Sequence, residues 1–102
     1  MSCVEQIFNA ISQFLRKGQG QIPKAAKYIL TELNEHSTME SYDQAYFTII
    51  KWIDHPSNIV TEVIAFKKCL HALRQFIFRE QANQTLSRYL IRYHRLRESQ
   101  NV

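Results

Sequence analysis

The chain has 102 residues, of which 45% are hydrophobic and 12% aromatic, which is enough apolar material for one packed domain. Its two glycines and two prolines provide too few turn residues for an all-β fold. Two cysteines and a start that lacks a basic, apolar leader predict a reduced, cytoplasmic protein, and no apolar run is long enough to cross a bilayer.

The formal net charge of +4 is unevenly distributed along the chain. Residues 67–102 carry eight basic side chains against two acidic ones, whereas residues 37–66 carry one basic side chain against four acidic ones. A basic segment beside an acidic one is typical of a protein that meets its partner in a fixed orientation.

The N-terminal third of the chain predicts two helices, because apolar residues recur there at steps of three and four. The first helix runs from about Val4 and ends at Arg16 and Lys17, since basic residues suit the negative end of a helix. Gly18 is expected to cap it in a left-handed conformation. The second helix has Pro23 in its first turn.

A third helix is predicted to begin at one of two capping-box patterns, in residues 37–40 or 41–44. Its apolar face runs from Tyr42 to Ile53, and Pro56 ends it by disfavouring helical geometry in the preceding residue. Ser57 or Asn58 is expected to cap the helix that follows.

The fourth predicted helix is the longest and the most apolar. Its wide stripe suggests the central helix of a bundle, contacted from more than one side. The stripe comprises Ile59, Val60, Val63, Ile64, Phe66, Leu70, Ala72, Leu73, Phe76 and Ile77.

A fifth segment runs to about Arg97 without an intervening glycine or proline. One helix over both segments would be about 60 Å long, too long for a compact domain, so a bend is expected near residues 78–80. The predicted fold is all-α, a single-domain antiparallel bundle of four or five helices over residues 1–102, with residues 99–102 frayed. The residues expected to face inward are Ala82, Leu86, Leu90, Tyr93 and Leu96.

No catalytic, cofactor-binding or metal-binding pattern stands out in the sequence. The four histidines lie on different predicted elements without the spacing of a zinc hydrolase. Residues 18–20 are too short for a phosphate-binding loop, and no strand precedes them. We therefore expect a protein that is not an enzyme and that uses no cofactor.

The candidate partner-binding residues lie mainly near the C-terminus, where Arg88, Arg92 and Arg95 share a helix face with Tyr89 and Tyr93 at its edge. Three interpretations remain open. The face can be simply solvated. It can dock to an acidic protein surface, membrane-associated or not, or to anionic lipid head groups, because arginine binds carboxylate and phosphate through two hydrogen bonds. It can also bind nucleic acid, the less favoured partner.

Phe47 and Trp52 lie off the apolar face of the third predicted helix. One interpretation is that they cover a second neighbour within the domain. The other is a surface patch for a partner, which includes a second copy of the chain in a homodimer.

The C-terminal half resembles the small immunity proteins that protect producers of pediocin-like bacteriocins. The similarity lies in residues 55–60, the long apolar helix that ends at residues 76–78, and the polar step into the last helix over residues 81–90. The resemblance implies a cytosolic, non-enzymatic four-helix bundle whose basic C-terminal region sets partner specificity and blocks a toxin-engaged membrane receptor complex. The helix at residues 41–54 and the low lysine content depart from that pattern.

Overall fold

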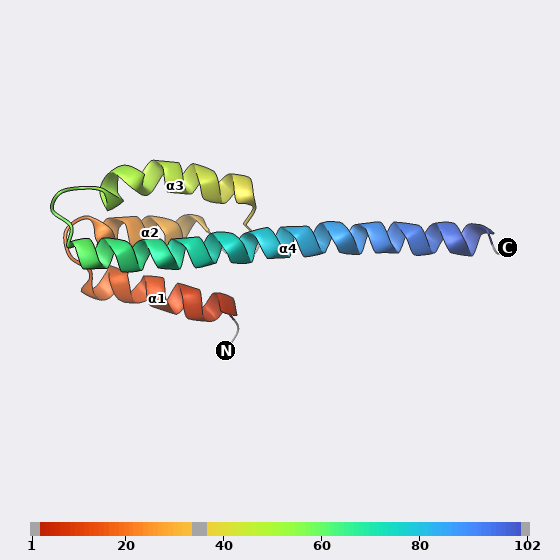
Figure 1. Cartoon of the computed structure of the whole chain (residues 1–102), viewed down its shortest axis with the longest axis horizontal. Coiled ribbons are helices and arrows are strands. Elements are labelled where there is room, and N and C mark those ends of the chain that lie inside the picture. The colour runs from red at the N-terminus through yellow and green to blue at the C-terminus, as the bar shows by residue number, and fades with distance from the viewer. Residues whose placement is uncertain (1–2, 34–36, 101–102) are drawn as a thin grey trace.

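The computed structural model describes residues 3–33 and 37–100, with side chains described for residues 4–33, 37–83 and 90–96. The described residues form the helices α1 (Cys3–Lys17), α2 (Ile22–Glu32), α3 (Met39–Ile53) and α4 (Val60–Gln100), and no strand (Figure 1). This confirms the all-α prediction. The first half of α4 lies along the other helices, and its second half projects beyond them.

The core lies between α1, α2, α3 and the first half of α4, up to residue 81. We call these four segments together the body. α2 contacts each of the other helices, and Phe14 of α1 meets Phe66 of α4 edge to face at a centroid distance of 5.3 Å. The buried residues follow the predicted steps of three and four within each helix. They are Ile7, Ile11, Ile22, Ala25, Ala26, Ile29, Leu33, Tyr42, Ala45, Ile49, Ile53, Phe66, Leu70, Leu73 and Ile77.

Asn58 joins the α1–α2 turn to the end of α3. Its Oδ1 accepts a hydrogen bond from the backbone of Gln21 at 2.7 Å, and its Nδ2 donates to the carbonyls of Trp52 and Ile53 at 2.7 and 2.6 Å. The side chain therefore bonds one backbone N–H of the α1–α2 turn and two carbonyls at the end of α3, which differs from the expectation that Ser57 or Asn58 caps the next helix.

The left-handed glycine is Gly20, with φ of 62°, and the prediction for Gly18 was wrong. Gly18 still donates its N–H to the Phe14 carbonyl at 2.8 Å, so the helical pattern continues past Lys17 and the chain reverses two residues later. A Cβ at Gly20 would lie 2.6 Å from Oδ1 of Asn58, so this position requires glycine on steric grounds as well.

α3 begins near the first of the two predicted positions, one residue later than the pattern in residues 37–40 indicates. Thr38 is its N-cap and forms a reciprocal pair with Ser41, with hydrogen bonds of 3.1 and 2.9 Å between each side chain and the other residue's N–H. The Met39 N–H donates to Oε1 of Gln81 at 3.1 Å, which fixes the start of α3 against α4.

The predicted bend near residues 78–80 is wrong, because α4 is unbroken from Val60 to Gln100. The described residues span 67 × 28 × 20 Å with a radius of gyration of 18.2 Å, whereas a compact chain of this length has about 13 Å. Nothing in residues 78–83 breaks a helix, and the body closes its core without the residues that follow. The helix also passes the predicted end near Arg97, and residues 101–102 lie outside the described residues.

The buried stripe of α4 is narrower than the sequence suggested. Val60 is 71% exposed and Ile64 52% exposed, and Ile59 and Ala72 are exposed as well. The described residues of the fifth segment, which were expected to face inward, are also exposed. α2, rather than α4, is the most enclosed helix, since Ile22, Ala25, Ala26 and Ile29 have no exposed surface.

Candidate functional site

The second half of α4 is the part of the molecule most open to a partner. We call residues 82–100 of α4 the arm; in Figure 1 it extends beyond the ends of α1, α2 and α3. All of its described side chains, at residues 82–83 and 90–96, are exposed. At 1.5 Å per residue the arm is about 28 Å long.

One face of the arm continues the line by which α4 packs in the body. That line runs through Phe66, Leu70, Leu73 and Ile77, all buried. The same steps of three and four lead on to residues 81, 84, 88, 91 and 95, so the line changes from apolar to polar and basic where the body ends. We call the part formed by Arg88, Ile91, Arg92 and Arg95 the arginine face.

A second line of residues lies about 130° around the helix axis from the arginine face, at about 100° of rotation per residue. We call it the apolar stripe; Leu90 lies at its edge and Phe78 continues it toward the body. Leu96 is 60% exposed and Tyr93 56%. The stripe comprises Ala82, Leu86, Tyr89, Tyr93 and Leu96.

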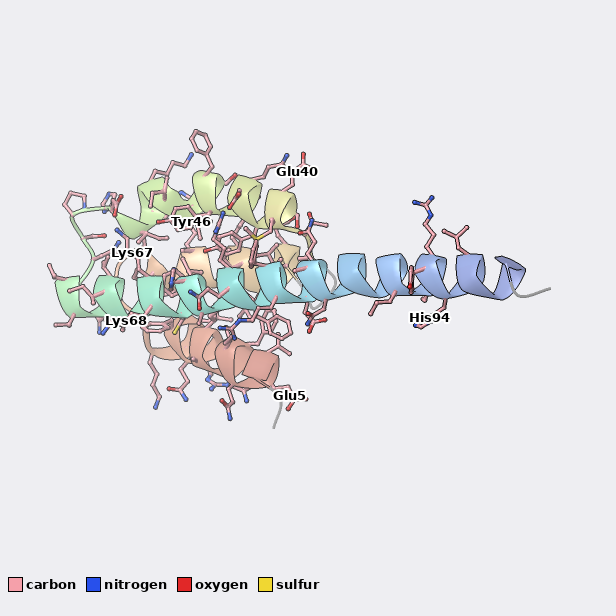
Figure 2. The ribbon with its side chains drawn as sticks, turned by 45° about the vertical axis from the view of Figure 1, so that its right-hand side comes forward. Glu5, Glu40, Tyr46, Lys67, Lys68 and His94 are labelled. Atoms are coloured by element: carbon pink, nitrogen blue, oxygen red, sulfur yellow. The ribbon has the colours of Figure 1, made fainter. Side chains whose placement is uncertain are left out.

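Two of the three predicted arginines, Arg92 and Arg95, lie where a partner can reach them. Arg92 and Arg95 are exposed, and no ion pair among the described residues involves either one. The Tyr93 ring lies 5.9 Å from the ring of His94, which Figure 2 labels on the arm. Arg88 and Tyr89 belong to α4, but their side chains lie outside the described residues.

Phe47 and Trp52 do not form one patch with each other or with the arm. Trp52 is half-buried against Tyr28 of α2, with an edge-to-face centroid distance of 5.7 Å, and Nζ of Lys24 lies 4.5 Å from its ring centre. It therefore covers a second neighbour, as one of the two interpretations held. Phe47 is 81% exposed and remains a separate surface residue on α3.

Two acidic side chains of residues 37–66 form ion pairs with basic side chains of α4. Lys67 of α4 contacts Asp54 at 3.1 Å, and Arg74 contacts Asp43 at 3.2 Å. These pairs are between exposed side chains and are weak. They nevertheless place two of the acidic groups of residues 37–66 beside the first half of α4.

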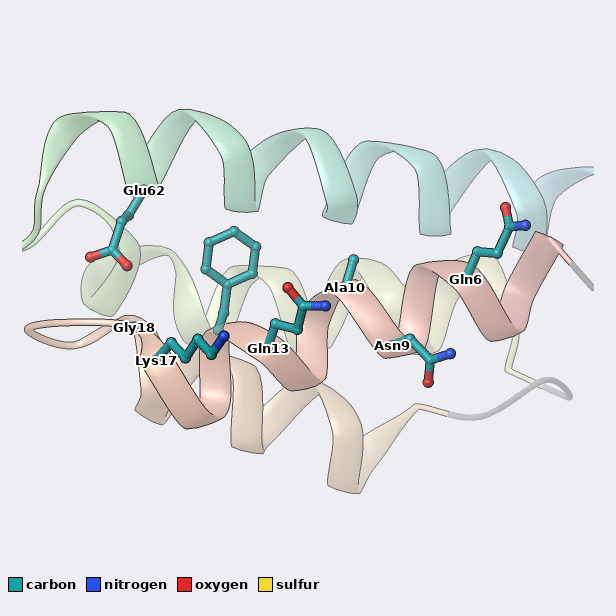
Figure 3. A pocket seen from close by; sticks show the side chains of 8 residues that line it. Gln6, Asn9, Ala10, Gln13, Lys17, Gly18 and Glu62 are labelled. Atoms are coloured by element: carbon teal, nitrogen blue, oxygen red, sulfur yellow. The ribbon is translucent and has the colours of Figure 1, made fainter. Parts of the chain in front are cut away.

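Two depressions of about 450 Å³ each follow the seam between α1 and α4. Gln13 and Lys17 of α1 and Glu62 of α4 line the first one (Figure 3), and Oε1 of Glu62 accepts a hydrogen bond from the Gln19 N–H at 3.2 Å. The second is lined by residues such as Ala72 and Phe76. The second depression also contains the Cys69 thiol and Lys68, whereas no hydroxyl or thiol side chain lines the first.

A third depression of about 360 Å³ lies between α3 and α4, with Tyr42, His71 and Arg74 in its lining. The Tyr42 hydroxyl already has a hydrogen-bond partner, because it donates to the Leu70 carbonyl at 3.0 Å. Burial, assisted by the nearby Tyr46, raises the pKa of Tyr42 well above its usual range. The pKa of Cys69 is also raised by burial, which makes its thiol a poor nucleophile.

The part of the chain that the structure describes holds no group of three or more side chains that could bind a metal ion. It also holds no helix that is both long and apolar enough to span a membrane. Comparisons with protein-family models, with curated proteins and with solved structures found no match. The arm is therefore the candidate site on its geometry alone.

Proposed function

We propose that this protein is a non-catalytic interaction module of the cytoplasm that binds an acidic partner protein through the arginine face of its arm. One observation carries the proposal: Arg92 and Arg95 are exposed on a helix that projects beyond the body, on the side where α4 elsewhere packs its core. Exposed guanidinium groups at successive turns can bind carboxylates through paired hydrogen bonds without rearrangement of the body.

Photo-crosslinking in lysate of the native host, where the salt concentration can be set, tests this proposal. A photoreactive residue at position 91 lies between Arg88 and Arg95, and one at position 47 reports on the body. We expect position 91 to capture a partner protein with an acidic surface. Capture should be lost when Arg88, Arg92 and Arg95 are changed to Ala, and it should weaken between about 0.05 and 0.5 M salt because surface charges are then screened.

The matched control removes the same charge from the body, by changing Arg16, Lys17 and Lys27 to Ala. These side chains are exposed on α1 and α2. Capture that persists in the arm variant, or that is lost equally in both variants, would contradict the proposal. Recovery of RNA or DNA at position 91, with a steep loss of binding as salt rises, would instead identify a nucleic-acid-binding regulator.

The most specific version of the proposal is bacteriocin immunity, and it comes from the sequence resemblance. Under this version the arm acts on a membrane receptor complex that a pediocin-like bacteriocin has engaged. Expression of the chain in a strain sensitive to such bacteriocins should then protect it, and the arm variant should not protect. Sensitivity that stays unchanged across a panel of these bacteriocins would remove this version and leave the general one in place.

A further inference from the structure

We infer that the apolar stripe of the arm is a docking surface for a second copy of this chain, and that the two arms pair in antiparallel orientation. This surface meets the arginine face only at Arg92, which flanks it, and the inference does not depend on the proposed function. The inference starts from large apolar side chains that remain exposed to solvent in a single copy of the chain. Tyr93, Leu96 and Leu90 are each at least half exposed on one side of the same helix.

The spacing of the stripe points to another helix as the occupant. From Ala82 to Leu96 its residues follow at steps of four, three, four and three, which is the 3.5-residue repeat of a coiled-coil seam. A helix that lies on a membrane or in a broad groove has a wider apolar face with a period of 3.6. The seam positions carry no formal charge, so a second copy can approach without burying a charged group.

The charges beside the seam select the antiparallel orientation. In a parallel pair, Arg92 on one flank of the seam would face Arg97 of the second copy, and this repulsion would occur twice. In an antiparallel pair centred near residue 91, Arg97 faces Asn83 of the second copy, and only Arg92 meets its own counterpart. The two Leu90 side chains then meet beside the symmetry axis and add apolar contact.

The same antiparallel register matches side chains of similar character along the seam. Residue 86 lies opposite residue 96, which pairs leucine with leucine, and residue 89 lies opposite residue 93, which pairs tyrosine with tyrosine. Residue 82 lies opposite residue 100, so each body begins where the other arm ends and the bodies do not collide. Because the seam covers only about two heptads, we expect a weak, concentration-dependent dimer.

Sedimentation equilibrium on the full chain tests the association. The apparent mass should rise from 12.1 kDa toward twice that value as concentration increases. Changing Tyr93 and Leu96 to Gln should hold the protein at the monomer mass. Ile91→Gln is the matched control, because Ile91 is 54% exposed on the opposite face of the same arm and should not affect the association.

Salt separates this surface from the arginine face. Raising the salt concentration should leave the dimer unchanged or strengthen it, since apolar contact persists and the repulsion between the two Arg92 side chains is screened. A dissociation constant of about 1 mM marks very weak association. A wild-type chain that stays monomeric up to that concentration would overturn the inference. So would a Y93Q/L96Q variant that associates as well as wild type, or a stripe that binds lipid vesicles while the protein remains monomeric.

Disulfide trapping tests the orientation in a background that carries Cys3→Ser and Cys69→Ala. A mixture of Leu86→Cys and Leu96→Cys chains should cross-link with each other. Leu96→Cys alone should not, because antiparallel arms hold those two positions about 15 Å apart along the axis, beyond the reach of a disulfide. Efficient cross-linking of Leu96→Cys with itself would overturn the antiparallel arrangement.

Discussion

Tyr42 combines a buried ring with a polar group that has a fixed partner. The side chain is 3% exposed, and its hydroxyl donates to the Leu70 carbonyl across the α3–α4 interface. Burial is the main reason that the pKa of Tyr42 lies above its usual range; Tyr46 and Asp43 raise it further, and Arg74 partly offsets them. The folded protein therefore holds this proton more tightly than the unfolded chain does.

This difference predicts a loss of stability at alkaline pH. Below the ordinary tyrosine pKa of about 10, both states keep the proton and the contribution is fully present. Above it, the unfolded chain ionises first, so the free energy of unfolding falls as pH rises. Tyr42→Phe should cost about 1 kcal/mol at neutral pH and should reduce this decline, as measured by urea unfolding between pH 8 and 11.

Tyr93→Phe, on the exposed arm, is the control and should keep the wild-type decline. The explanation from Tyr42 would fail if the Tyr42→Phe variant lost stability above pH 10 as steeply as wild type. Since the sequence alone shows only an apolar face that contains Tyr42, the role of its hydroxyl became apparent only from the packing of α3 on α4.

At the scale of elements, local signals predicted helix ends well. Basic residues marked the end of α1 at Lys17, Pro23 marked the start of α2, and hydroxyl residues marked the start of α3. Each signal acts within a few residues of its own backbone. The local signal proposes Ser57 or Asn58 as the cap of α4, whereas the Asn58 side chain bonds Trp52, Ile53 and the distant Gln21.

The error over α4 came from an assumption about the whole chain. A compact shape for 102 residues predicts a bend at residues 78–80 that no residue there demands. The sequence did contain a contrary signal, since the line through Leu73 and Ile77 continues to Arg88 and Arg95. The sequence alone does not predict whether the other helices of the chain cover the apolar stripe, because this depends on where those helices end relative to α4.

The arm should contribute little to the stability of the body. The buried core ends at Ile77 among the described residues, and the described arm side chains are exposed. A chain that ends after residue 83 should therefore lose less than about 1 kcal/mol of unfolding free energy at a concentration where wild type is monomeric. Ile77→Ala in the full chain should cost about 2–5 kcal/mol, as expected for a buried large-to-small change.

Thermal and urea unfolding of the two variants would measure this contrast. A truncated chain that unfolds as readily as Ile77→Ala would contradict the division of α4 into a body half and an arm. The result also decides whether the body alone can be used to study contacts away from the arm.

At the scale of the whole molecule, the arm makes the protein elongated. Small-angle X-ray scattering at low concentration should give a radius of gyration near 18.2 Å. Changing Ala82 and Asn83 to Gly should lower it, because glycine weakens the helix where the arm leaves the body, by about 1 kcal/mol relative to alanine and by less relative to asparagine.

Glycines at Ala72 and Gln75 provide the matched control, since this part of α4 is held by its neighbours and the overall dimensions should not change. A wild-type value near the roughly 13 Å of a compact chain would show that the arm folds back in solution. Measurement across a concentration series distinguishes the shape of one copy from the association of two.

The unbroken path of α4 from core to tip also makes it a spacer. A ligand held near Arg95 would sit about 20 Å from the point where the arm leaves the body at residue 82. A second ligand could occupy the exposed surface around Phe47 without touching the first. The chain could thus bridge two bodies at a distance set by the number of helical turns, and inserting or deleting whole turns would change that distance in steps of about 5.4 Å.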